Sequence, residues 1–318
     1  MNPPLPPTSR TTVAVRDLRK TYGAVEAVRG LSFEIRAGEC FGLLGPNGAG
    51  KTTTIEILEG LLAPTGGEVT VLDRQWGRDD REIRERLGVC LQETQLADKL
   101  QVGETVELFR ALYRRGREPE AVIAEVGLVE KRLARVASLS GGQKQRLAVA
   151  CALVGDPEIL FLDEPTTGLD PQSRRQVWEI VNAFKARGRT VLLTTHYLDE
   201  AERLCDRIAV VDHGKVIAEG TPRELVRSLG GEHVVEISLG DDGRGPFAPS
   251  RLQDLPAVRS VHAEAGHVLL TVTEPHLAIP PLLERLQSEG RTLASLTTRQ
   301  ASLEDVFVSL TGRHLRDE

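Results

Sequence analysis

The chain has 318 residues, of which 40% are hydrophobic and 27% are charged, as is ordinary for a globular protein with a sizeable core. The net charge of -6 and a pI near 5.8 indicate no basic surface, so we expect no nucleic-acid partner. No apolar run reaches the about 18 residues of a membrane span, and no signal peptide is visible. We therefore expect a chain that neither crosses a membrane nor is exported.

The first residues predict a tail followed by an antiparallel pair of strands. Residues 1–11 are rich in proline and poor in apolar side chains, which indicates a disordered tail or, alternatively, a peptide-docking segment. Residues 13–18 alternate as a strand does, and residues 27–35 are typical of its antiparallel partner.

A glycine-rich loop then follows a buried strand and opens a helix. Residues 40–44 are apolar like a buried strand, and apolar residues recur at helical spacing after residue 52. The loop has the pattern G-x-x-x-x-G-K-[ST], whose backbone N–H groups and lysine bind nucleotide phosphates, while its Thr52 hydroxyl binds Mg²⁺. The candidate ligands are Gly45, Pro46, Asn47, Gly48, Ala49, Gly50, Lys51, Thr52 and Thr53.

Two side chains outside the loop are candidates to reach the same nucleotide. Tyr22 lies upstream on the predicted sheet, where its ring can stack on adenine, although such a tyrosine is more often a core or turn residue. Gln92 follows the predicted strand of residues 87–91. A glutamine there can contact Mg²⁺ and the attacking water, although alone it would be read as a surface residue.

Residues 102–136 are amphipathic and predict a helical insertion between two strands of the main sheet. Ser140, Gly141, Gly142 and Gln143 follow and lead into a helix expected at residues 144–154. Ser140 can cap this helix, and the glycines leave its amino end bare as a second anion site. Because the glycine loop already binds the phosphates, a second site suggests a nucleotide shared between two copies of the chain.

Acidic residues and a histidine follow the next predicted strands. Asp163 ends a buried strand that begins at residue 159, where it would hold Mg²⁺, and Glu164 would polarise the attacking water. The alternative is a pair of carboxylates that caps a helix. Asp170 precedes a helix expected at residues 171–186, and His196 follows a buried strand at residues 190–194. At this sheet edge His196 is a candidate contact to the γ-phosphate.

The composition changes after about residue 230. Before it, residues 208–218 predict a hairpin and residues 223–229 a closing helix. Beyond it, the order is strand, helix at 251–255, two strands, helix at 279–289 and strand, followed by a helix at 303–310. This βαββαβ order predicts a small ferredoxin-like α+β domain, in which we find no catalytic constellation. The predicted organisation is therefore a tail (residues 1–11), a main domain (12–230) and an accessory domain (231–318).

The histidines and cysteines show no metal-ligand spacing. His262, His267 and His276 are therefore expected on the surface. The cysteines form no C-x-x-C pair, and we expect small core residues in a reducing compartment rather than disulfides or a zinc site. They are Cys40, Cys90, Cys151 and Cys205.

The order and spacing of these motifs resemble the ATP-binding subunits of ABC transporters, from residue 12 to about 228. In this resemblance the glycine loop is the Walker A motif, Gln92 the Q-loop, and residues 139–143 the signature. Residues 159–163 with Glu164 are the Walker B motif and catalytic glutamate, residues 167–170 the D-loop, and His196 the switch histidine. The implied fold is an α/β P-loop NTPase with an antiparallel β-subdomain, a helical insertion and the accessory α+β domain.

Three further stretches are similar to the drug-exporter branch of this family, the daunorubicin-resistance type subunits of bacteria. They are residues 195–202, 217–222 and 303–313. Related subunits export polysaccharide, lipid or other antibiotics, so this similarity implies export of a drug, antibiotic or lipid-like compound without naming it.

The resemblance also implies a mechanism. Two copies close head to tail with ATP between the Walker A loop of one and residues 140–143 of the other, with Asp170 at the same interface. Hydrolysis, with Glu164 as base and His196 on the γ-phosphate, drives a separate permease that docks near Gln92 and the helical insertion. The subunit is then peripheral on the cytoplasmic face of a bacterial membrane. The alternatives are an importer ATPase and a non-transport ABC ATPase. Among non-transport ABC ATPases, translation-type members carry two cassettes in one chain, and chromosome members insert a long coiled coil.

Overall fold

A computed structural model describes residues 10–92, 94–231, 233–240, 248–264 and 267–311. The described residues form two compact units, which join in the sequence between Glu219 and Gly220 and are treated separately below. Most of the predicted N-terminal tail lies outside the described residues, and the first strand begins at Thr11.

A six-stranded sheet forms the centre of the first unit, in the order β5-β6-β7-β3-β8-β9. The strands from β5 to β8 pair in parallel, and every residue of β3, β6 and β7 is buried. Parallel strands end at one edge of a sheet, so the residues after β3, β5, β6 and β7 come together. The strands are β3 (Cys40–Leu44), β5 (Leu87–Cys90), β6 (Ile159–Asp163), β7 (Thr190–Thr195), β8 (Arg207–Asp212) and β9 (Lys215–Gly220).

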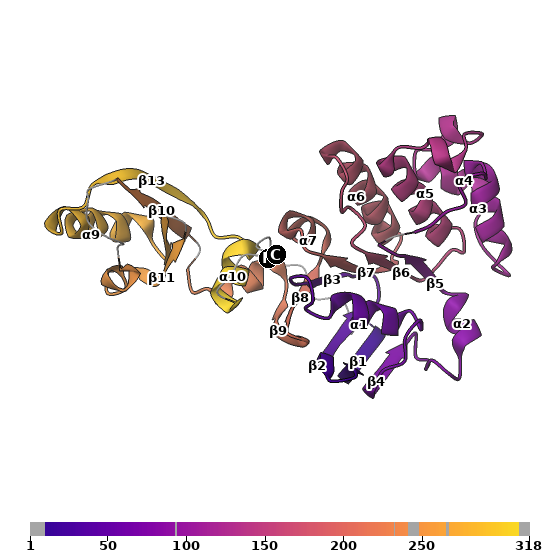
Figure 1. The fold of residues 1–318 in the computed structure, drawn as a ribbon, viewed down its shortest axis with the longest axis horizontal. Coiled ribbons are helices and arrows are strands. Elements are labelled where there is room, and N and C mark those ends of the chain that lie inside the picture. Colours follow the sequence, from indigo (N-terminus) through magenta and orange to yellow (C-terminus); the bar gives the residue numbers. More distant parts are fainter. Residues whose placement is uncertain (1–9, 93, 232, 241–247, 265–266, 312–318) are drawn as a thin grey trace, which may run out of the picture. The chain divides into compact units, whose positions relative to one another are not determined.

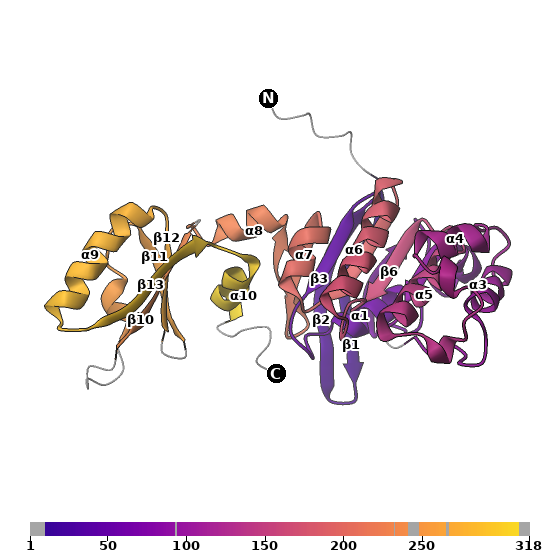
Figure 2. The same ribbon diagram turned by 90° about the horizontal axis from the view of Figure 1, so that it is seen from above.

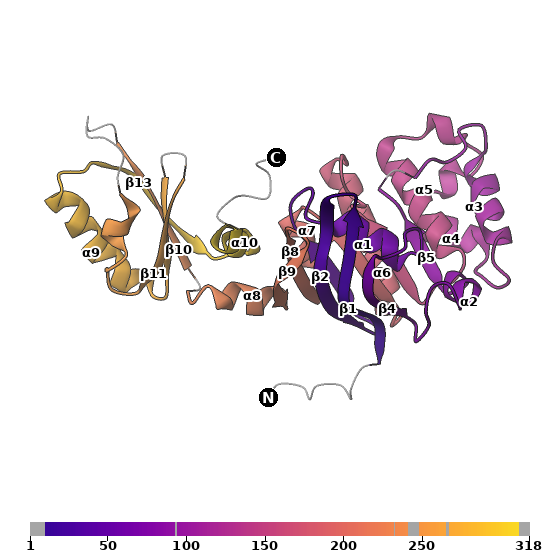
Figure 3. The ribbon, with the colours of Figure 1, turned by 60° about the horizontal axis from the view of Figure 1, so that its bottom comes forward.

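A smaller antiparallel sheet, in the order β2-β1-β4, confirms the strand pair predicted near the N-terminus. Its strands are β1 (Thr11–Tyr22), β2 (Val25–Arg36) and β4 (Gly66–Val71), and they lie together in Figure 3. Phe33 of β2 stacks on Phe41 of β3, with ring centroids 5.2 Å apart, so the two sheets share one hydrophobic core.

The predicted helical insertion is present, and α3, α4 and α5 pack against one another on one side of the unit (Figure 1). Helix α5 begins at Gly141, three residues earlier than the sequence suggested, because Ser140 caps it directly. The helices of the unit are α1 (Lys51–Leu58), α2 (Asp80–Arg84), α3 (Val102–Ala111), α4 (Pro119–Glu125), α5 (Gly141–Leu153), α6 (Pro171–Ala186) and α7 (Leu198–Leu204), with 3₁₀ turns η1 (Val129–Lys131) and η2 (Val136–Ser138).

The second unit is built on a four-stranded antiparallel sheet in the order β11-β12-β10-β13, as a ferredoxin-like chain predicts. Helices α9 and α10 lie on opposite sides of this sheet (Figure 2), and α8 packs against α10. The elements are α8 (Pro222–Ser228), β10 (His233–Leu239), η3 (Pro249–Leu252), β11 (Val258–Glu264), β12 (His267–Val272), α9 (Pro275–Ser288), β13 (Leu293–Gln300) and α10 (Leu303–Thr311).

Two helix predictions in this unit were wrong in detail. The helix expected at residues 251–255 is only the 3₁₀ turn η3, since prolines at positions 249 and 256 leave little room for an α-helix. Helix α9 begins at Pro275, four residues before its predicted start. Pro280 and Pro281 lie inside it as its sixth and seventh residues, where each removes one helical hydrogen bond.

Candidate functional site

The glycine loop binds its own lysine at the start of α1. Gly50, the residue before the helix, has a φ of 99°, and a Cβ atom there would lie 2.7 Å from the Ala27 carbonyl oxygen. Glycine is therefore required at this position. Lys51 Nζ donates to the carbonyl oxygens of Gly45 at 2.8 Å and Pro46 at 3.0 Å. The ammonium and the first amides of α1 thus share one small region, which favours an anion.

Asp163 ends β6 beside this loop and is 3% exposed. The Thr194 hydroxyl donates to its carboxylate and accepts a hydrogen bond of 3.0 Å from the Glu164 amide. Burial raises the pKa of Asp163, although the Thr194 hydrogen bond opposes this shift. One threonine of the neighbouring strand therefore fixes both acidic residues.

Glu164 is the centre of the polar cluster and is 8% exposed. Its Oε2 lies 3.1 Å from His196 Nδ1, and it accepts from Thr167 Oγ1 at 3.1 Å and Gln92 Nε2 at 3.4 Å. Its Oε1 lies 3.8 Å from Lys51 Nζ. The close contact with His196, with help from Lys51 and against the effect of burial, lowers the pKa of Glu164. This side chain is therefore a carboxylate at neutral pH and can accept a proton.

The backbone at Glu164 is also unusual, with a φ of 47° in the left-handed region. A residue with a Cβ atom adopts this conformation at an energetic cost, and such strain is concentrated at functional sites. It turns the side chain from the end of β6 toward Lys51 and His196, and the two carboxylates do not act as a helix cap.

Thr52, Asp163 and Gln92 provide the oxygen atoms that Mg²⁺ prefers. Thr52 lies exposed in the first turn of α1, and Gln92 lies just after β5. These donors fit one Mg²⁺ ion shared with the phosphates, and the metal ligands stay a prediction.

The candidate signature forms a helix start of its own. The Gln143 amide donates to Ser140 Oγ at 3.3 Å, and the Ser140 amide donates to Gln143 Oε1 at 3.0 Å, so the predicted cap is confirmed. A Cβ atom at Gly142 would lie 2.2 Å from Ser173 Oγ, which explains the glycine. The amides of Gly141 and Gly142 belong to the first turn, which leaves such donors without helical acceptors. They are available to an anion from outside.

The structure shows which groups Asp170 and Tyr22 contact, while the roles of these two residues at the nucleotide stay predictions. Asp170 caps α6, because its carboxylate accepts from the amides of Gln172 and Ser173, both at 3.0 Å. The ring of Tyr22 is 47% exposed at the end of β1, and Lys20 Nζ lies 5.1 Å from its centroid.

The structure adds residues that the sequence analysis did not single out. Besides Thr194, the fully buried Glu200 of α7 accepts from Thr166 Oγ1 and Trp178 Nε1, each at 2.9 Å. It joins the segment after Glu164 to α6 and α7. These partners are separated by tens of residues along the chain, so no local pattern announces them.

None of the described helices has the length and apolar character needed to span a membrane. All four cysteines are buried thiols, as expected.

Comparisons with known proteins cover both units. The family model described as ABC transporter matches residues 28–167. A second model, described as ATP-binding protein DrrA1-3-like, C-terminal domain, matches residues 220–311. The Nod factor export ATP-binding protein I of Rhizobium meliloti (strain 1021) is 43% identical, over 98% of this chain and 92% of that protein.

Solved structures give the same result for the first unit. The structure of an ATP-binding subunit of an ABC transporter is 30% identical, with a TM-score of 0.64, over 69% of this chain and 94% of that chain. A dimeric ATP-binding cassette in a post-hydrolysis state, bound to ADP and Pi, is 28% identical, with a TM-score of 0.60, over 66% of this chain and 98% of that chain.

Proposed function

The chain belongs to the ATP-binding subunits of ABC transporters, and we propose that it is the Mg²⁺-dependent ATPase that drives a separate export permease. The observation that carries this proposal is the Glu164 carboxylate, held by His196 and Gln92 next to Lys51. A cassette that only binds nucleotide has no need of this arrangement. The substitution that tests it opens the Discussion.

The residues divide the work of hydrolysis between binding and proton transfer. The loop amides and Lys51 bind the phosphates, and Lys51 exchanges the carbonyl oxygens of Gly45 and Pro46 for phosphate oxygens. Bound Mg²⁺ supplies positive charge to the phosphates. Glu164 accepts the proton of the attacking water, and His196, whose Nδ1 lies 3.1 Å from Glu164 Oε2, is placed to reach the γ-phosphate.

We further propose that two copies share each ATP in a head-to-tail dimer. The bare amino end of α5 is a second anion site, and the dimeric cassette bound to ADP and Pi supports pairing in proteins of this fold. Residues 140–143 of one copy then face the glycine loop of the other.

Mixing two defective variants tests this sharing. Ser140→Ala and Lys51→Ala should each be defective alone. In a mixed dimer one site combines the intact loop of the first variant with the intact signature of the second. We expect the mixture to hydrolyse more ATP than the two variants measured apart.

Ser140→Ala also removes a helix cap, and Thr221→Ala is the matched control. Thr221 caps α8 with the same reciprocal pair of hydrogen bonds, in the other unit. This variant should keep normal turnover. A mixture no more active than its separate components would contradict a shared site.

A groove at the helical insertion is our candidate binding site for the permease. It has a volume of about 580 Å³, and α2, α3, β5 and α5 contribute its walls. Phe109 and Leu112 give it an apolar side, and Leu112 is 70% exposed. Apolar groups exposed in a groove are typical of a protein interface. We propose that a cytoplasmic segment of the permease binds here and holds the subunit on the membrane.

Leu112→Asp should abolish capture of the permease while ATP binding is kept, because a carboxylate cannot be buried cheaply in an apolar interface. The measurement is mass spectrometry of membrane proteins that copurify with the tagged chain trapped with ATP. Leu133→Asp is the control, since Leu133 is 68% exposed and lies outside the groove lining. Equal recovery with both variants would move the permease to another face.

The class of cargo rests on the relatives and on the second unit. The DrrA1-3-like match and the relatives whose names specify Nod factor export support export rather than import. We propose a drug, an antibiotic or a lipid-like compound as cargo, with the permease supplying its path.

A further inference from the structure

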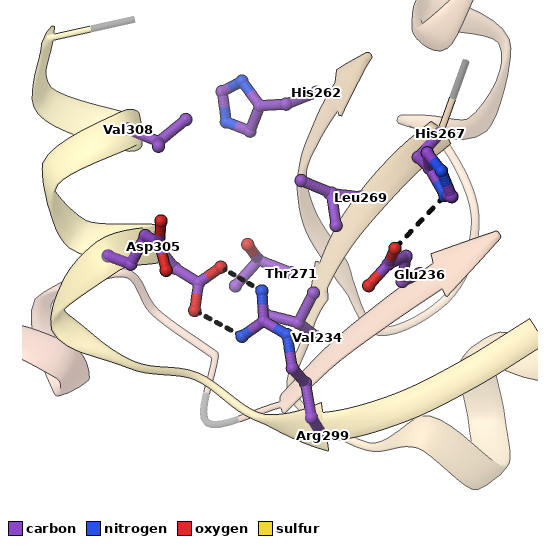
Figure 4. A pocket seen from close by; sticks show the side chains of 10 residues that line it. Val234, Glu236, His262, His267, Leu269, Thr271, Arg299, Asp305 and Val308 are labelled. Carbon is purple, nitrogen blue, oxygen red and sulfur yellow. Dashed lines mark hydrogen bonds and ion pairs between the residues drawn. The ribbon is translucent and has the colours of Figure 1, made fainter. Parts of the chain in front are cut away.

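The second unit contains a cavity on the sheet face opposite its hydrophobic core. Side chains alternate along each strand, so Val235 and Leu270 pack in the core below α9. Their neighbours Val234 and Leu269 point to the other face, where α10 adds Val308. Between this face and α10 lies a cavity of about 280 Å³ (Figure 4).

One wall of the cavity is a rigid ion pair. Arg299 of β13 donates two hydrogen bonds, of 2.7 and 2.8 Å, to the carboxylate of Asp305 on α10. The amide and hydroxyl of Ser302 donate to the same carboxylate at 2.8 and 2.9 Å. Burial opposes the charge on Asp305, but Arg299 and Ser302 outweigh it and lower the pKa of this group. These bonds fix the start of α10 to the sheet, so the cavity does not depend on a loose helix.

His262 places a polar ring atom without a hydrogen-bond partner at the cavity. Its Nε2 is buried and has no hydrogen-bond partner among the described residues. The expected surface position is therefore wrong for this ring atom, whereas His267 and His276 are exposed, at 47% and 74%. A buried polar atom without a partner is costly, and a ligand with a polar group facing this ring would remove that cost.

The charges of the lining favour a cation. It contains three carboxylates, Glu236, Glu304 and Asp305, against the single guanidinium of Arg299. Arg299 is hydrogen-bonded to Asp305 and also attracts Glu236, whose Oε1 lies 3.2 Å from His267 Nδ1. With neutral histidines the lining carries a formal charge of -2.

We propose that this cavity is a binding site for a small amphipathic amine. The ammonium group lies at Glu236, and a short apolar body lies on Val234, Leu269 and Val308. The volume is at the small end of ligand pockets, about 300–1,000 Å³, so the ligand has on the order of ten heavy atoms.

Three probes of one shape test the preference for an amine on the full-length chain without nucleotide. They are 2-phenylethylamine, 2-phenylethanol and 3-phenylpropionate, followed by saturation-transfer NMR and titration calorimetry. We expect the amine to bind with a Kd of about 1 mM or below, and the carboxylate at least about tenfold more weakly. No binding by the amine, or equal binding by the carboxylate, would overturn the proposal.

Two variants place the amine in the cavity. Glu236→Gln removes the anion with little change of shape, and Leu269→Trp fills the space; each should weaken amine binding at least about fivefold. Glu274→Gln is the control, because Glu274 is also paired with a histidine, His276, but lies outside the cavity. Undiminished binding by both cavity variants would contradict the site. ATP turnover is not measured, so failure here is separate from failure of the proposed function.

Discussion

Replacing Glu164 with glutamine is expected to reduce ATP turnover by at least about 100-fold, the usual scale for the loss of a general base. Glutamine keeps the shape and the hydrogen bonds to Thr167 and Gln92 but cannot accept a proton from water. ATP binding should persist, since the glycine loop and Lys51 are unchanged. Steady-state phosphate release measures the first effect, and equilibrium binding of a fluorescent ATP analogue measures the second.

The control for this substitution is Glu179→Gln on the exposed surface of α6, which removes the same charge away from the cluster. It should leave turnover within about twofold of wild type. Turnover near normal in Glu164→Gln would exclude Glu164 as the base. Loss of both binding and turnover would indicate instead that Glu164 holds Lys51 in place, at 3.8 Å.

The candidate site was largely predictable because its motifs are local. The runs before Gly45 and before Asp163 are apolar at every position, which is typical of strands buried on both faces, and both strands lie inside the sheet. Since parallel strands end at one edge, the motifs after them had to meet, and Glu164, His196 and Gln92 are indeed in contact.

What escaped prediction depends on contacts between distant parts of the chain. Thr194 is one of many strand threonines until pairing of β6 with β7 places it beside Asp163. His262 has an ordinary sequence context, and only the packing of α10 over the sheet places it in a cavity. Burial of a single side chain is a tertiary property, and neither composition nor periodicity contains it.

Glu59 is a second residue of this kind, and it has a measurable consequence. It follows α1, is 4% exposed, and neither carboxyl oxygen has a hydrogen-bond partner among the described residues. Burial, with the charges of Asp163 and Glu56, raises its pKa from 4.5 to about 8. At neutral pH the folded chain therefore keeps this carboxyl protonated, whereas the unfolded chain ionises it.

The sign of the pH effect follows from proton binding. Between pH 4.5 and 8 the folded state holds more protons at Glu59 than the unfolded state does. The free energy of unfolding therefore falls as the pH rises through this window and levels off above it. At about 1.4 kcal/mol per pH unit, the destabilisation is on the order of 5 kcal/mol above pH 8.

Glu59→Met should remove this pH dependence while roughly preserving side-chain length. We expect the free energy of unfolding of the variant to exceed that of wild type at pH 9 and to approach it at pH 5. The advantage should grow by about 4 kcal/mol between these pH values. Both tryptophans, Trp76 and Trp178, belong to the first unit, so their fluorescence during urea unfolding reports on this unit alone.

Leu58→Met is the matched control, a buried neighbour on the same helix whose replacement removes no titrating group. Its stability change should be the same at every pH. Parallel pH curves for wild type and Glu59→Met would contradict a buried, destabilising carboxyl.

Glu59 also lines the groove proposed for the permease. A variant that is more stable but captures less permease would therefore explain why a costly group is kept, since binding surfaces often retain residues that lower stability.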